Sequence, residues 1–176
     1  MSDYMGMEYL RRKLNQKRQR VNLRYKYYDM KNYTRDFGIS TPPELRAFNS
    51  SLGWCAKAVD SLADRVVFNE FRNDILAMNE IYQMNNPDIL FRSAELSAMI
   101  AGCAFIYIQP AEKKNEAPLM QVIDGANATG IIDTVTGLLK EGYAVLKRDE
   151  YGTVLTEAYF LPNETKVCYK GKNYSD

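Results

Sequence analysis

The side chains best suited to chemistry are carboxylates and basic groups, because the sequence contains no histidine. Without histidine there is no Ser-His-Asp or Cys-His nucleophile, no histidine-ligated zinc and no HExxH protease motif. The sequence also lacks the GxxxxGK[ST] and GxGxxG loops whose backbone amides cradle phosphates. Enzymatic chemistry in this chain would therefore depend on carboxylates alone.

Asp60 and Asp64 are the best-spaced carboxylates, since one helical turn between them could place a divalent cation between their oxygens. Lys57 and Arg65 flank this pair, so ordinary ion pairs on a helix surface explain the same pattern. Three further aspartates occur in or beside turn sequences, where a short carboxylate accepts bonds from local backbone amides: Asp124, Asp133 and Asp149. A carboxylate nuclease would need several such groups to converge, so we predict no catalytic residue, no metal ligand and no cofactor.

The N-terminal part of the chain is strongly basic. Its first 31 residues contain nine lysines and arginines against three acidic residues, whereas the whole chain has a net charge of +1. Tyrosines accompany these charges, so the segment could neutralise phosphates and stack on bases. The same pattern fits the exposed side of a helix that docks in an assembly. The candidate nucleic-acid or assembly contacts are Arg11, Arg12, Lys13, Lys17, Arg18, Arg20 and Arg24.

The composition is that of an ordinary globular domain, with 46% hydrophobic and 26% charged residues in a chain of 176. Cys55, Cys103 and Cys168 are odd in number and far apart, which favours free thiols in a reducing compartment. The N-terminus has no apolar signal-peptide run, and the longest apolar run is shorter than the roughly 20 residues that cross a bilayer. We therefore expect a soluble, intracellular protein with no membrane partner.

The segment from Ser50 to Arg72 is predicted to organise the fold. Its apolar residues recur at steps of three and four, which indicates an amphipathic helix: Leu52, Cys55, Ala56, Val59, Leu62, Ala63 and Val66. From Val66 the period changes to two in a β-branched and aromatic run, which predicts a strand at Val66–Phe68. We expect this helix and strand to form the nucleus of the domain, with Trp54 in core or subunit packing.

The remaining pattern predicts more helices and then strands. A long, partly exposed helix is expected from Met7 to about Tyr28, followed by a linker from Thr34 to Pro43. Two further helices are expected from Asn73 or Asp74 to about Met84, with Ile75 and Leu76 on its apolar side, and from Ile89 to about Ala101, where Gly102 would provide the C-terminal cap. The predicted strands are Ala104–Gln109, Leu119–Ile123, Gly130–Ile132, Leu138–Arg148, Thr153–Leu161 and one that starts at Val167–Tyr169.

These elements predict an α+β fold, in which a long basic N-terminal helix and three shorter helices pack on a mainly antiparallel sheet. The last strand would have no partner before the chain stops at Asp176. An open strand edge favours aggregation. We therefore expect the chain to be a fragment.

Tyr27 and Tyr28 begin a series of segments whose order and spacing are distinctive. The later members are Gly38-Ile39, Pro42-Pro43-Glu44-Leu45, Trp54, Val59-Asp60-Ser61-Leu62-Ala63, Arg65, Phe71, the run from Ala101 to Phe105 and the hairpin from Asp133 to Gly137. Together they resemble the front part of the portal proteins of tailed bacteriophages, the siphophage-type head-to-tail connectors. The likeness spans roughly Tyr27 to Leu161, with Asp29-Met30 and Glu70 where the family would have glycine.

The resemblance implies a structural subunit and not an enzyme. Portal proteins form rings, usually of twelve subunits, through which DNA is packaged and ejected, and the ring links head to tail while a separate terminase hydrolyses ATP. This chain would be the N-terminal wing portion, with residues 1–33 as a basic helical arm and residues 34–176 as an α+β wing-like domain truncated at its C-terminal end. Subunit packing would involve Trp54, Tyr27 and Tyr28.

The implied partners are other copies of the chain, capsid and scaffolding proteins and, through parts absent from this chain, terminase and DNA. The implied location is the virion, or the host-cell cytoplasm during assembly, of a phage or prophage. One alternative is a small nucleic-acid-binding protein that acts through its basic N-terminal arm. A metal-dependent carboxylate hydrolase is the third hypothesis.

Overall fold

The computed structural model describes residues 4–31, 42, 52–111, 117–169 and 172–175. Within them it contains four helices: α1 (Met7–Tyr28), α2 (Trp54–Ala63), α3 (Met78–Met84) and α4 (Pro87–Ala101). The strands are β1 (Ala104–Gln109), β2 (Leu119–Asp124), β3 (Ala128–Ile132), β4 (Leu139–Arg148), β5 (Val154–Leu161), β6 (Glu164–Tyr169) and β7 (Lys172–Ser175). They form a two-stranded sheet, β1-β2, and a five-stranded sheet in the order β3-β4-β5-β6-β7, both antiparallel. The predicted α+β class is confirmed.

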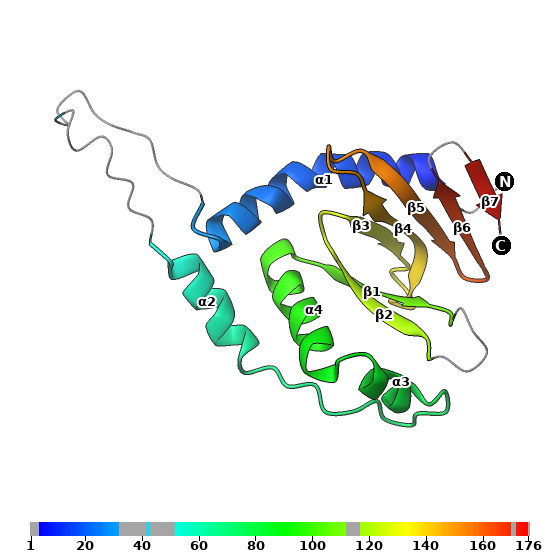
Figure 1. Ribbon diagram of the computed structural model, residues 1–176, viewed down its shortest axis with the longest axis horizontal. Coiled ribbons are helices and arrows are strands. Elements are labelled where there is room, and N and C mark those ends of the chain that lie inside the picture. Colours follow the sequence, from blue (N-terminus) through cyan, green and yellow to red (C-terminus); the bar gives the residue numbers. More distant parts are fainter. Residues whose placement is uncertain (1–3, 32–41, 43–51, 112–116, 170–171, 176) are drawn as a thin grey trace.

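The elements stack in four layers (Figure 1). α1 lies across one face of the five-stranded sheet, and the β1-β2 ribbon lies against the other face. α3 and α4 cover the side of the ribbon that faces away from the large sheet. Because successive side chains of a strand point to opposite faces, Tyr143 and Val145 of β4 pack against α1, whereas Ala144 and Leu146 pack against the ribbon.

α1 supplies the central apolar contacts of the large sheet. Its predicted bounds are confirmed at both ends. Leu10 and Leu14 lie one turn apart on the same helix face, and they are 0% and 2% exposed in a cluster with Tyr143, Val145 and Tyr159. A long polar helix is stable here because the sheet provides the partner surface that such a helix needs.

The expectation that Ser50–Arg72 forms the nucleus of the domain is wrong. α2 covers only ten residues, and Ala63 is its one buried residue. No strand forms at Val66–Phe68, where the described chain is irregular. The apolar stripe of α2 has no sheet to cover because α1 occupies that face, so α2 packs beside α4 and α1 instead. Phe68, the last residue of the predicted strand, packs inward, and its ring stacks on the ring of Phe91 with 4.0 Å between the centroids.

The helix predicted from Asn73 or Asp74 begins later, at Met78. Asp74 still caps it, because its carboxylate accepts hydrogen bonds from the amides of Met78 and Asn79 at 2.6 Å each. Ile75 and Leu76, expected on the apolar side, are instead 93% and 76% exposed. They precede the helix, so the helical period that placed them inward does not apply.

The predicted end of α4 is confirmed, since Gly102 adopts a left-handed conformation with φ of 87°. β6 begins at Glu164, before the predicted Val167, because a two-residue hairpin at Pro162-Asn163 pairs Leu161 directly with Glu164. The expectation that this strand lacks a partner is wrong, since β7 pairs with it. The linker predicted from Thr34 to Pro43 lies, apart from Pro42, outside the described residues.

Candidate functional site

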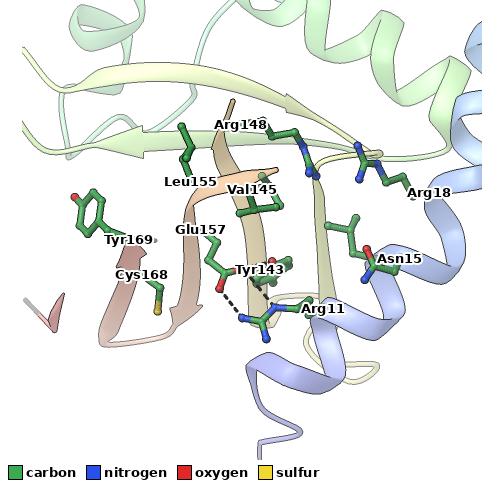
Figure 2. A pocket seen from close by; sticks show the side chains of 12 residues that line it. Arg11, Asn15, Arg18, Tyr143, Val145, Arg148, Leu155, Glu157, Cys168 and Tyr169 are labelled. Carbon is green, nitrogen blue, oxygen red and sulfur yellow. Dashed lines mark hydrogen bonds and ion pairs between the residues drawn. The ribbon is translucent and has the colours of Figure 1, made fainter. Parts of the chain in front are cut away.

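A cavity of about 400 Å³ lies between α1 and the sheet face that carries Tyr143 and Glu157 (Figure 2). α1 lines it with residues spaced by three or four positions, which places them on one side of the helix: Arg11, Leu14, Asn15 and Arg18. Arg148, Leu155 and Tyr169 line it from the sheet. Three arginines and one glutamate face the cavity, so positive charge predominates there.

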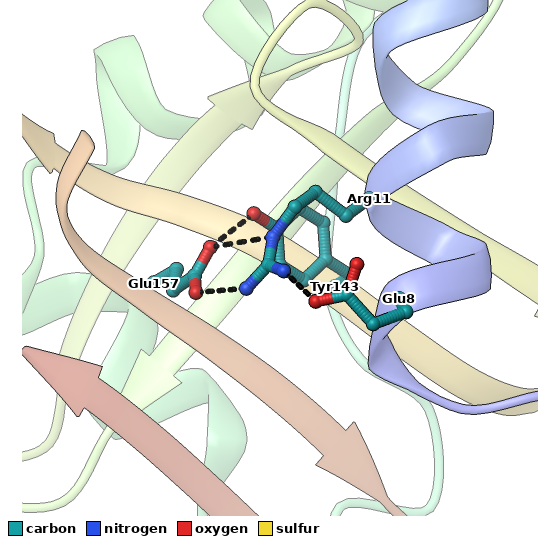
Figure 3. A network of polar contacts seen from close by, with 4 residues as sticks. All are labelled: Glu8, Arg11, Tyr143 and Glu157. Carbon is teal, nitrogen blue, oxygen red and sulfur yellow. Dashed lines mark hydrogen bonds and ion pairs between the residues drawn. The ribbon is translucent and has the colours of Figure 1, made fainter. Parts of the chain in front are cut away.

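Arg11 belongs to an ion-pair network at one end of this cavity (Figure 3). Its Nη2 and Nε donate to the Glu157 carboxylate at 2.5 and 3.4 Å, and the Tyr143 hydroxyl donates to the same carboxylate at 2.5 Å. Glu8, one turn earlier in α1, also pairs with Arg11. The hydrogen bond from Arg11 to Glu157 raises the pKa of Arg11, and burial together with Glu157 raises the pKa of Tyr143 to about 12. The charge of Arg11 is thus neutralised within the protein.

Arg18 and Arg148 lack such compensation. Figure 2 shows their guanidinium groups pointing toward one another, one from α1 and the other from β4. Arg148 donates to a side-chain amide oxygen at 3.3 Å and to a backbone carbonyl oxygen at 3.0 Å, and neither acceptor is charged. Arg18 has no hydrogen-bond or ion-pair partner in the described part of the chain. The pKa of Arg148 is lowered, mainly by burial and to a lesser extent by the positive charge of Arg18. Tyr143 and Asp124 raise this pKa, but by less.

Glu141 anchors the segment before α1 to the sheet and is 1% exposed. Its carboxylate accepts hydrogen bonds from the backbone amides of Met5 and Gly6 at 2.7 and 3.0 Å, and from the Tyr159 hydroxyl at 2.8 Å. Burial by itself raises the pKa of Glu141, but the hydrogen bonds outweigh burial and the pKa is lowered overall. Nothing local in the sequence singles out Glu141, since an acidic residue near a strand end is usually exposed.

The basic candidates of α1 are divided between the interior and the surface. Lys13 donates to a backbone carbonyl of β3 at 2.8 Å, and Arg24 donates to the carbonyl of the last residue of α4 at 2.8 Å. Lys17 donates to the Cys103 thiol at 3.5 Å and lies 5.9 Å from the centroid of the Phe105 ring. Two candidates are exposed and have no hydrogen-bond or ion-pair partner among the described residues: Arg12 and Arg20.

The three aromatic candidates lie near α2 but differ in their contacts and exposure. Tyr28 donates its hydroxyl to Asp60 Oδ1 at 2.8 Å, which ties the end of α1 to α2. Tyr27 and Trp54 are 49% and 76% exposed, so neither belongs to the core. Core packing of Trp54 is therefore excluded, and its assignment to subunit packing stays a prediction.

The paired carboxylates, Asp60 in α2 and Asp64 directly after it, are bound by side chains of other helices. Asp60 accepts the Tyr28 hydrogen bond, and Asp64 forms an ion pair with Arg92 of α4 at 2.7 Å. Within the described part of the chain, neither aspartate forms the predicted ion pair with Lys57 or Arg65. Across the described residues, no group of three or more histidines, cysteines, aspartates or glutamates is arranged to hold a metal ion.

The turn aspartates behave as predicted. Asp124 accepts bonds from two amides of its turn at 2.8 and 2.9 Å, and Asp133 accepts one from Val135 at 2.8 Å. Asp149 accepts bonds from Tyr151 and Thr153 at 3.0 and 2.7 Å. These carboxylates therefore have structural roles in their turns.

The three cysteines are free, as predicted, with Cys55 exposed and Cys103 and Cys168 half-buried. None of the described helices combines the length and the apolar character needed to cross a bilayer. A second cavity, of about 500 Å³, lies between the β1-β2 ribbon and the large sheet, and its walls are mainly apolar and aromatic. The cavity with the arginines is the better candidate site, because its charged side chains converge from α1, β4 and β5.

No family model matches the sequence, and no curated protein matches it significantly.

Proposed function

We propose that this chain is the wing portion of a phage portal subunit, a structural component of the ring through which DNA is packaged and ejected and which links head to tail. In this role it packs against copies of itself and against capsid or scaffolding protein, and it performs no catalytic step. The order of sequence segments that resembles portal proteins suggests this role. One feature of the molecular surface supports it.

The supporting observation is an apolar surface formed by α2 and the irregular segments on either side of it, which we name the α2 flank. Six of its large apolar side chains are between 57% and 93% exposed: Leu52, Trp54, Leu62, Val67, Ile75 and Leu76. The α2 flank follows one side of the molecule, away from the five-stranded sheet (Figure 1). Subunit interfaces bury exposed apolar side chains of this kind, often around a tryptophan.

The alternative function, nucleic-acid binding through the basic N-terminal arm, has less support. Arg11, Lys13, Lys17 and Arg24 are engaged with groups of this chain. Of the seven basic candidates, Arg12 and Arg20 are the exposed ones without a described partner. Two exposed arginines supply a weak electrostatic footprint for a phosphate backbone.

The proposal is tested by expressing the gene from its natural locus and measuring the native mass of the product, with negative-stain microscopy of the same sample. We expect rings with a central hole. A product that stays monomeric at high concentration would contradict the portal hypothesis, and salt-dependent DNA binding would then support the alternative.

The role of the α2 flank is tested in the same preparation. The double substitution Ile75→Asp and Leu76→Asp should abolish ring formation, because buried and unpaired carboxylates are costly at an interface. Val135→Asp is the matched control, since Val135 is 91% exposed in the β3–β4 turn, outside the α2 flank. Rings that form equally well with the double substitution would show that the α2 flank is not the interface.

A further inference from the structure

We propose that the cavity between α1 and the large sheet binds a phosphate ester, whose phosphate group is held by Arg18 and Arg148. This site is separate from the proposed ring contact, since none of the exposed apolar residues named for the α2 flank lines the cavity.

The charge of the cavity calls for an anion. Three arginines and one glutamate line it, and that glutamate, Glu157, is already bound by Arg11 and Tyr143. The charge of Asp124 raises the pKa of Arg148, but the Asp124 carboxylate already accepts hydrogen bonds from the amides of its own turn. Two guanidinium groups that face one another without an acid between them repel, so an anion placed there gains Coulomb energy from both.

The donors suit phosphate better than carboxylate. A guanidinium presents parallel N–H groups that match two oxygens of one acceptor. Because Arg18 and Arg148 approach from different elements, the ligand must offer oxygens in more than one direction. A phosphate group has three terminal oxygens arranged tetrahedrally, so it can accept from both guanidinium groups at once, whereas a carboxylate has only two oxygens in one plane.

The remaining wall indicates an organic group attached to the phosphate. Leu155 and Tyr169 lie on the side of the cavity away from α1 and its arginines (Figure 2). A volume of about 400 Å³ is within the range of small-molecule sites and exceeds what a free phosphate needs. We therefore assign the ligand class as a phosphate monoester of nucleotide size, with its organic part against Leu155 and Tyr169.

The test is titration calorimetry of the 176-residue chain with adenosine monophosphate, inorganic phosphate, a short DNA duplex and citrate as a carboxylate control. We expect adenosine monophosphate to bind more tightly than inorganic phosphate. Arg18→Gln and Arg148→Gln should each weaken that binding by about 10- to 100-fold, the loss expected for hydrogen bonds to a charged group. Arg20→Gln is the control, because Arg20 is an exposed arginine of the same helix outside the cavity. This variant should bind adenosine monophosphate as tightly as the unsubstituted chain does.

Several outcomes would overturn the proposal. They are the absence of binding by either phosphate ligand, equal weakening by Arg20→Gln, or citrate binding as tightly as the phosphate ester. The DNA duplex could also bind equally well to the Arg18→Gln and Arg148→Gln variants. That result would assign phosphate recognition to another surface and would contradict the proposal. Circular dichroism without ligand is the check on folding: Arg18→Gln should unfold at the same temperature as the unsubstituted chain or higher, because it relieves repulsion. Lower stability would mean that Arg18 is structural.

Discussion

Replacing Glu141 with glutamine should weaken the connection between the N-terminal segment and the large sheet. The carboxylate is 1% exposed, and its Oε1 accepts the Met5 amide while its Oε2 accepts both the Gly6 amide and the Tyr159 hydroxyl. A glutamine side chain has nearly the same volume but only one acceptor oxygen. Its amide nitrogen would therefore face at least one donor that now has no acceptor.

The size of the effect follows from these contacts. A hydrogen bond to a charged group contributes about 1.5–3 kcal/mol, and a buried donor left without an acceptor costs about 1–3 kcal/mol. Removing the negative charge also removes the cost of burying it, so part of this loss is recovered. We expect the free energy of unfolding to fall by about 2–4 kcal/mol.

The assay is urea unfolding at neutral pH, followed by far-ultraviolet circular dichroism, together with amide hydrogen exchange. Exchange at Met5 and Gly6 should become much faster in Glu141→Gln, which separates local release of the segment from global unfolding. Glu150→Gln, in the exposed β4–β5 turn, is the control and should change stability by less than about 0.5 kcal/mol. If Glu141→Gln is as stable as this control and exchange at Met5 and Gly6 is unchanged, the anchoring role of Glu141 is wrong.

Other measurements test the core, the polar contacts and the titrating groups. Leu14→Ala should lower the free energy of unfolding by about 2–5 kcal/mol. Leu23 of the same helix is 45% exposed, so Leu23→Ala should lower that free energy by less than about 1 kcal/mol. Equal losses for the two substitutions in urea unfolding would refute the central role of α1. Asn85→Ala should lower the free energy of unfolding by about 2–3 kcal/mol in the same assay. The buried side-chain amide of Asn85 donates hydrogen bonds to the carbonyls of Ile81 and Pro118 and accepts one from the backbone amide of Met120. A loss below about 0.5 kcal/mol would contradict this role. The lowered pKa of Glu141 contributes stability that is present above its unfolded pKa of about 4.3 and is lost as the pH falls through the folded value, so acid unfolding of Glu141→Gln should show a weaker pH dependence. Burial raises the pKa of Tyr143 and Tyr159 to about 12, so their contribution is present below about pH 10 and is lost as the pH rises toward 12; an ultraviolet absorbance titration in which all tyrosines ionise near pH 10 would contradict it.

Features that depend on neighbouring residues could be predicted from the sequence. Both ends of α1 agree with its run of helix-forming residues, and Gly102 ends α4 because glycine tolerates a φ of 87°. The turn aspartates bind amides only two to four residues away. In each case the partner lies within a turn or two of the chain, so spacing alone identifies it.

The candidate site was only partly predictable for the same reason. Arg11 and Arg18 stood out as members of a basic helix, but the helical pattern could not tell an arginine that faces the sheet from one that faces solvent. The residues that they face, Glu157, Tyr143 and Arg148, lie on strands far along the chain. Glu141 is 136 residues from Met5, whose amide it binds.

The sequence by itself determined the α+β class, the extent of α1, the strand order along the chain and the turn chemistry, because each depends on local propensity and periodicity. Only the tertiary structure decided which helix is central. α2 has the more regular apolar stripe, yet Leu10 and Leu14 of α1 are the residues buried on the large sheet. Periodicity shows that a helix has an apolar face, but which surface that face covers depends on packing between segments distant in sequence. The convergence of Arg18 and Arg148 is a consequence of that packing.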